Sequence, residues 1–224
     1  VVGDLVREER YEDAIPHLKR LASDEENGAN VHFTLALVFY ELERFNESQD
    51  NVHRALSLGY EDKASAYFQL GLIDEQLNMM GSAANWFASV PRGTRFVEAQ
   101  KRLAKIKFTL DGLKPTIDYL TKRSLDNPEY FVVFVELQGM IYREAGAMDD
   151  YFRVLDEGLA KRPKEPSLLY SSAMAAEQLG LIDVLELRLR RLIELEPDNA
   201  QAFNALGYTL ADKTDRFGEA KALL

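Results

Sequence analysis

A repeat of about 34 residues runs along this chain of 224 residues and constrains its fold more than any other feature. Six copies align on a small residue with spacings of 35, 33, 35, 34 and 34 residues. The six anchors are Ala36, Gly71, Ala104, Gly139, Ala173 and Gly207. In a repeat chain each unit buries its hydrophobic face only by stacking on its neighbours. We therefore expect a stack of similar units.

The clearest copies share a large aromatic residue, a Leu-Gly pair, and an Ala followed four residues later by a large apolar residue. They are Tyr67, Leu70, Gly71, Ala83 and Phe87, and then Phe203, Leu206, Gly207, Ala220 and Leu224. This pattern resembles the tetratricopeptide repeat, a hairpin of two helices. The resemblance covers essentially the whole chain. It implies an all-α, right-handed α-solenoid of helix-turn-helix hairpins.

The spacing of the anchors predicts the domain organisation. We expect a single solenoid over residues 1–224 that opens with a partial repeat over 1–28. Further repeats are expected over about 29–63, 64–96, 97–131, 132–165 and 166–199, with a truncated one over 200–224. A hairpin that is incomplete at either end would leave apolar surface bare, which predicts self-association or a longer native chain.

Each residue type that recurs among the copies has a physical reason. A small anchor such as Gly71 lets the two helices of a hairpin approach, and we expect the Ala of the second helix to be the facing contact. Gly146 and Gly180 fall at the turn between helices, where a left-handed residue ends the first helix at little cost, and Asn78 can take the same role.

The prolines also follow the repeat. Pro128, Pro163 and Pro197 are expected between hairpins, where a proline stops one helix without breaking the next. Pro16 is expected near the start of its helix, where it costs less than at the centre.

Composition limits the classes of function. The net charge of -10 would on the whole repel a phosphate backbone, so nucleic acid is not expected as a partner. The absence of cysteine excludes disulfides, thiolate nucleophiles and Cys-based metal sites. The longest strongly apolar stretch, residues 33–40, is far shorter than the roughly 20 residues that cross a bilayer, so we expect no membrane span.

Catalytic motifs are missing. No nucleotide-binding Gly-rich loop, zinc-protease helix or nucleophile elbow occurs. His17, His32 and His53 lack metal-ligand spacing, and the acidic pairs at 25–26 and 149–150 are interpreted as helix-start or solvated charges. We expect no catalytic residue, no metal and no cofactor, and conclude that the chain is not an enzyme.

Three local features have a structural interpretation. The glycosylation-like triplet at 46–48 lies at the start of a second helix and is discounted. Trp86 and Phe87, with Met79 and Met80, are interpreted as core beside Ala83. The basic cluster is interpreted as a solvated face that balances acidic neighbours, with a site for an acidic partner segment as the alternative; it comprises Arg92, Arg95, Lys101, Arg102, Lys105 and Lys107.

In this repeat family the first helices line the concave side, and offsets from each anchor predict the side chains that point inward. The candidate peptide-binding residues are Phe33, Leu37, Tyr40, Phe68, Leu72, Lys101, Lys105, Met140, Arg143, Tyr170, Met174, Asn204 and Tyr208. A solvent face so rich in aromatic and aliphatic residues is typical of an interaction site. The alternative is that another part of the protein covers these residues as core.

One recognition mode of the family is not expected here. The repeats that grip a C-terminal carboxylate place Asn one residue after the anchor, and none of the corresponding positions in this chain is Asn; they are Leu37, Leu72, Lys105, Met140, Met174 and Tyr208. A mainly apolar ligand, extended or helical, is preferred.

Residues 192–220 are similar to the closing repeats of proteobacterial tetratricopeptide proteins, notably in the run Asn204–Asp212. That group includes outer-membrane lipoproteins that act as adaptors for carboxy-terminal processing proteases. The resemblance implies a scaffold or adaptor that binds a protease and its substrates on the periplasmic side of the outer membrane; without it, a cytoplasmic protein is expected. The alternative function is a structural subunit that oligomerises through the solenoid.

Overall fold

The computed structural model describes residues 2–22 and 28–224, and over this part of the chain every regular element is a helix. The predicted all-α class is confirmed. The chain divides into two compact units, Val1–Lys107 and Phe108–Leu224, and each is described by itself. The acidic pair at 25–26 lies outside the described residues.

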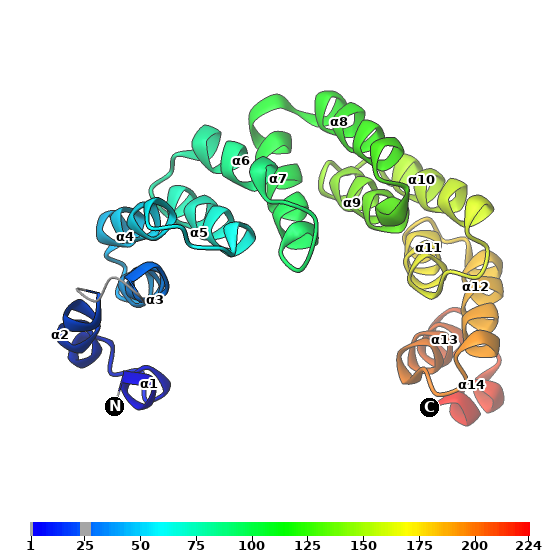
Figure 1. The fold of residues 1–224 in the computed structure, drawn as a ribbon. Coiled ribbons are helices and arrows are strands. Elements are labelled where there is room, and N and C mark those ends of the chain that lie inside the picture. The colour runs from blue at the N-terminus through cyan, green and yellow to red at the C-terminus, as the bar shows by residue number, and fades with distance from the viewer. Residues whose placement is uncertain (1, 23–27) are drawn as a thin grey trace. The chain divides into compact units, whose positions relative to one another are not determined.

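The first unit is built from short helices joined by tight turns (Figure 1). They are α1 (Val2–Arg7), α2 (Tyr11–Leu21), α3 (Gly28–Glu41), α4 (Phe45–Ser57), α5 (Lys63–Gln76), α6 (Met80–Ser89) and the greater part of α7 (Phe96–Asp111). Helix α3 packs on α4, and α5 packs on α6, so that each pair forms a hairpin.

The second unit repeats the same plan (Figure 1). Its elements are α8 (Leu113–Asp126), the short 3-10 helix η1 (Pro128–Tyr130), α9 (Phe131–Glu144), α10 (Met148–Lys161), α11 (Pro166–Gln178), α12 (Ile182–Leu195), α13 (Ala200–Lys213) and α14 (Phe217–Leu223). The hairpins are α9–α10, α11–α12 and α13–α14, and the second helix of one packs on the first helix of the next. The exact repeat boundaries remain a prediction.

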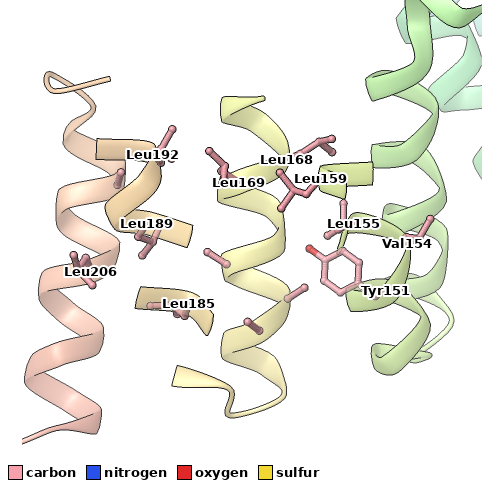
Figure 2. Packing of buried hydrophobic residues seen from close by; sticks show 14 of the residues in the cluster. Tyr151, Val154, Leu155, Leu159, Leu168, Leu169, Leu185, Leu189, Leu192 and Leu206 are labelled. Carbon is pink, nitrogen blue, oxygen red and sulfur yellow. The ribbon is translucent and has the colours of Figure 1, made fainter. Parts of the chain in front are cut away.

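The core of the second unit is a layer of leucines between successive helices, which Figure 2 shows from close by. Its members include Leu155 and Leu159 of α10, Leu168 and Leu169 of α11, Leu185, Leu189 and Leu192 of α12, and Leu206 of α13, all of them buried. Full burial of a leucine contributes roughly 1.5–3 kcal/mol. Each helix is therefore stabilised mainly by its neighbours in the stack.

The anchor glycines allow close packing, although the facing contact differs from the prediction. A Cβ atom at Gly71 would lie 2.5 Å from Cε1 of Phe87, so the residue that faces Gly71 most closely is Phe87 and not Ala83. At Gly139 the nearest atoms belong to Tyr151, at 3.2 Å. A bulky ring in the second helix fills the space that the glycine leaves open.

The predicted turn residues are confirmed. Gly146 and Gly180 have φ of 74° and 70°, and Asn78 has φ of 57°, in the left-handed region. Glu43 occupies the same turn of its hairpin with φ of 56°, which the sequence analysis did not predict. A glutamate tolerates this conformation less well than glycine.

Three of the four prolines placed from the sequence lie where the repeat predicts them relative to the helices. Pro128, Pro163 and Pro197 each follow the end of a second helix. Pro16 instead lies in the middle of α2, which begins at Tyr11, so the expected position near the helix start is wrong.

Candidate protein-interaction face

Two of the predicted binding residues are buried, contrary to expectation. Phe33 is 9% exposed and stacks on Tyr60 with ring centroids 4.4 Å apart. Phe68 is 7% exposed, lies 5.6 Å from the Phe87 ring, and has the Arg95 guanidinium 5.3 Å above it. Tyr60 and Arg95 belong to the segments that lead into the next hairpin. These connecting segments cover the rings of Phe33 and Phe68, so both phenylalanines are core.

The other predicted residues of α3 and α5 remain at least partly accessible. Leu37 is exposed, whereas Tyr40 and Leu72 are half-buried. The Tyr40 ring meets Phe45 edge-on, with centroids 5.5 Å apart. Tyr40 is therefore held in place by the second helix of its own hairpin while part of its ring stays open to solvent.

Lys101 and Lys105 are exposed on α7, where their spacing of four residues places them on one face. Their neighbour Arg102 instead pairs with carboxylates: its guanidinium lies 2.6 Å from Glu75 and 3.3 Å from Glu98. For Arg102, the interpretation of the basic cluster as a face that balances acidic neighbours is confirmed.

In the second unit, three predicted residues come together in one groove. Tyr170 and Met174 of α11 and Tyr208 of α13 line a groove of about 530 Å³. Tyr208 is 66% exposed, while Tyr170 and Met174 are half-buried against the leucine core. The first helices α11 and α13 thus present an aromatic and thioether surface. We call it the α11–α13 groove.

Two carboxylates give the α11–α13 groove an acidic character. Glu177 and Asp212 line it together with the three predicted residues, and both are exposed. Lys213, which follows Asp212, places its Nζ 2.7 Å from that carboxylate. Asn204, also predicted, is exposed on α13 but does not line the groove.

The remaining predicted residues, Met140 and Arg143 of α9, line a smaller recess of about 150 Å³ with Glu136 and Tyr151. The Arg143 guanidinium lies 6.0 Å from the centre of the Tyr151 ring. Burial raises the pKa of Glu136, and burial raises the pKa of the Tyr151 hydroxyl, although Arg143 opposes the second shift. This recess is polar and narrow compared with the α11–α13 groove.

A second cavity of the second unit was not predicted from the sequence. It measures about 560 Å³ and lies between α8, α9 and α10, on the side of the second helices. Its apolar part includes Phe131, Val135 and Val154, and its rim carries Lys161 and Arg162. The signal in the sequence is the irregular repeat around Ala104, which has Gln100 in place of the first aromatic residue and carries Gly112 and Pro115 where α8 begins. We call this cavity the α8–α10 pocket.

The histidines, acidic residues and glycosylation-like triplet that were given a structural interpretation take part in helix packing and in local hydrogen bonds. His32 Nδ1 lies 2.8 Å from Asn51 Oδ1, and Asp149 and Asp150 lie in the first turn of α10. Phe87 is fully buried as expected, but Met79 is 42% exposed and is not core. Ser48 of the glycosylation-like triplet is buried in α4.

Across residues 2–22 and 28–224, no cluster of His, Cys, Asp and Glu has the geometry to hold a metal ion. In the same ranges no helix combines the length and apolarity that a bilayer span requires.

The chain resembles known proteins in both sequence and structure. It is 32% identical over 160 residues to the TPR repeat-containing protein PA4667 of Pseudomonas aeruginosa. The alignment covers 71% of this chain and 27% of the relative, so the chain spans about a quarter of that protein's length. No family model matches the chain.

Two solved structures share the fold. The C-terminal part of a TPR repeat-containing protein from Cytophaga hutchinsonii has a TM-score of 0.56 and 18% identity, covering 99% of this chain and 91% of that one. PilW, a widely conserved type IV pilus biogenesis factor, has a TM-score of 0.53 and 16% identity, covering 87% of this chain and 90% of that one. At these identities the likeness shows the fold alone. With the six-anchor period and the Pseudomonas relative, it identifies the chain as a tetratricopeptide-repeat protein.

Proposed function

We propose that the chain is a non-catalytic scaffold that binds a peptide segment of a partner protein in the α11–α13 groove. The observation that carries the proposal is the convergence of Tyr170, Met174 and Tyr208 on one groove, with Tyr208 66% exposed. Aromatic residues and methionine at an accessible groove are typical of peptide recognition. The tetratricopeptide fold agrees with this role, since such proteins generally act as scaffolds for protein–protein interaction.

The chemistry of the α11–α13 groove defines the preferred segment. The three predicted residues would contact an apolar side chain, and Glu177, next to the Asp212 carboxylate that pairs with Lys213, would favour a Lys or Arg beside it. The wider net charge of -10 acts in the same direction. We expect a segment with an apolar anchor next to a basic residue.

A finer proposal is that this scaffold is an adaptor that presents substrates to a protease. It is supported by the similarity of residues 192–220 to the closing repeats of proteobacterial tetratricopeptide proteins and agrees with the Pseudomonas relative. An adaptor needs a second contact surface. In the first unit we propose Leu37, Tyr40 and Leu72, together with Lys101 and Lys105 of α7, for this role.

The alternative is a structural subunit that oligomerises. The observation in its favour is that Leu187 of α12 and Phe217 of α14 are 65% and 62% exposed. Both lie outside the α11–α13 groove, so an assembly formed through them would leave the groove open. Light scattering over a range of concentrations distinguishes a self-associating chain from a monomer.

The test is a selection of short random peptides displayed on phage. We expect enrichment of peptides with an apolar anchor next to Lys or Arg, and a Tyr208→Ala variant should bind them at least about 30-fold more weakly, because truncating an anchor typically costs about 2 kcal/mol. Leu187→Ala is the matched control, since it removes an equally exposed side chain outside the groove. Unchanged binding by Tyr208→Ala, or no enrichment of such peptides, would refute the proposed groove.

A further inference from the structure

The α8–α10 pocket is a second potential binding site with a different chemistry. Helices α8 and α10 both pack on α9, and the pocket of about 560 Å³ lies between them. It is separate from the α11–α13 groove, with which it shares no lining residue. The two sites also differ in the helices that line them: the pocket is lined by the second helices α8 and α10 together with the first helix α9, whereas the groove is lined by the first helices α11 and α13.

The floor of the α8–α10 pocket is apolar and firmly packed. Val135 and Val154 are 5% and 8% exposed, so they cannot move aside without disturbing the core. Gly158 lets α10 lie close to α9, because a Cβ there would be 2.7 Å from Cγ1 of Val135. At the edge, Leu125 of α8 lines the pocket and is 77% exposed. An apolar side chain entering here would cover Leu125.

The rim of the pocket is cationic, which is unusual on a chain with net charge -10. Lys161 Nζ and Arg162 Cζ lie 5.5 Å and 6.0 Å from the centre of the Phe131 ring. Within the described part of the chain neither makes an ion pair. Arg153 is neutralised, since it contacts Asp150 at 2.6 Å and Glu157 at 3.1 Å.

Glu157 also lines the pocket, where it pairs with Arg153, and two further carboxylates belong to a neighbouring recess. Glu129 and Glu165 line a space of about 240 Å³ that shares Phe131 and Arg162 with the α8–α10 pocket. Arg162 therefore lines both the pocket and the neighbouring recess that holds Glu129 and Glu165. Lys161 lines only the pocket, so it is the cation that most directly favours an anion there.

The polar groups of the pocket favour a peptide over a fatty acid. Thr121 Oγ1 donates to Gln138 Oε1 at 3.2 Å, and Gln138 Nε2 donates to the Phe134 carbonyl at 3.2 Å. Thr121 is exposed, so its hydroxyl can also pair with a peptide backbone. An alkyl chain has no group that could pair with the exposed Thr121 hydroxyl, whereas a peptide N–H could donate to its oxygen.

We propose that the α8–α10 pocket binds a partner segment in which an apolar side chain is followed by a carboxylate. The apolar side chain would lie on Val135 and Val154 against Leu125, and the carboxylate would meet Lys161. Charge complementarity is the reason for choosing this occupant: the α11–α13 groove carries Glu177 and Asp212 and would reject the same segment.

The same phage selection tests this proposal independently of the first. We expect a second enriched class, in which an apolar residue precedes Asp or Glu. For a synthetic peptide of this class, Lys161→Glu should weaken binding about threefold to tenfold, as expected for a rim charge. Leu125→Ser should also weaken it, about fivefold, through lost apolar contact. Both residues are exposed, so both variants are expected to fold, which circular dichroism would verify.

Matched controls separate this site from the α11–α13 groove. Lys221→Glu makes the same charge change at an exposed position of α14, and it should leave binding of the acidic peptide unchanged. Tyr208→Ala should abolish only the basic class. Absence of an acidic class, or equal binding by wild type and Lys161→Glu, would overturn the proposal. Displacement of the peptide by oleate with higher affinity would also overturn it, in favour of a lipid ligand.

Discussion

Replacing Gly71 by alanine should destabilise the first unit even though alanine is the better helix former. Gly71 lies within α5, and an added Cβ would be 2.5, 2.7 and 2.8 Å from Cε1, Cζ and Cδ1 of Phe87. The Phe87 ring is 0% exposed, so it has no free space to enter. Overpacking of this kind costs about 1–3 kcal/mol, whereas Ala in place of a mid-helix Gly recovers up to about 1 kcal/mol. We expect a net loss of about 1–2 kcal/mol.

The assay is urea unfolding followed by fluorescence. Trp86 is the single tryptophan, and it adjoins Phe87 and lies 5.7 Å from the Tyr67 ring, so it reports on this hairpin. Gly81→Ala is the control, because Gly81 is exposed and nothing lies within 4 Å of an added Cβ. The control should unfold at the same urea concentration as wild type or a higher one.

A double-mutant cycle identifies the clash. Phe87→Leu removes the ring that the new Cβ would meet, so Gly71→Ala should cost at least about 1 kcal/mol less in that background. If the Gly71→Ala variant unfolds at the same urea concentration as wild type, the inference that α5 and α6 pack too closely at Gly71 to admit a Cβ atom is wrong. If its cost is the same with leucine at 87, the Phe87 ring is not the obstacle.

Two further predictions concern a turn and an ion-pair network. Glu43→Gly should raise the free energy of unfolding by up to about 1 kcal/mol, because φ of 56° favours glycine; a lower melting temperature would contradict this. Hydrogen bonds from Arg216 and Arg190 lower the pKa of Glu186 to about 2, so its stabilising contribution is present above its ordinary pKa of 4.5 and is lost as the pH falls toward 2. Urea midpoints between pH 5 and 2 should therefore decline more steeply in wild type than in Glu186→Gln, and equal slopes would count against the network.

The hairpins could be predicted from the sequence because their determinants are local. A small residue every 34 positions or so is required wherever two helices touch, and Gly146 or Gly180 is required where the backbone turns left-handed. These constraints act within one repeat. These local constraints do not depend on how the neighbouring repeats pack.

Exposure could not be predicted in the same way, because it depends on segments outside the repeat pattern. Phe33 and Asn204 both lie three residues before the anchors of their first helices, yet Phe33 is 9% exposed and buried whereas Asn204 is exposed. Tyr60, in the connection between hairpins, stacks on Phe33. The offset from the anchor specifies the direction of a side chain, whereas the length and composition of each connection decide whether it is covered.

The α8–α10 pocket escaped prediction for a related reason. A cavity forms where side chains leave the space between helices unfilled. The pattern of apolar residues in a sequence shows which side chains can be buried, but not where such space remains. The sequence does not show that the Phe131 ring stays half-buried beside the pocket while Val154 below it is buried. Only the arrangement of α8 and α10 around α9 creates the pocket.

The two proposed sites of the second unit differ in charge, and this difference matters for a scaffold. Glu177 and Asp212 belong to the α11–α13 groove, whereas Lys161 and Arg162 belong to the α8–α10 pocket. A segment suited to one site is repelled from the other, because like charges would be brought together without a partner. Two sites of equal chemistry would compete for the same segment. Opposite charges instead allow one unit to hold two different segments at once, which is the property that a protein presenting one partner to another requires.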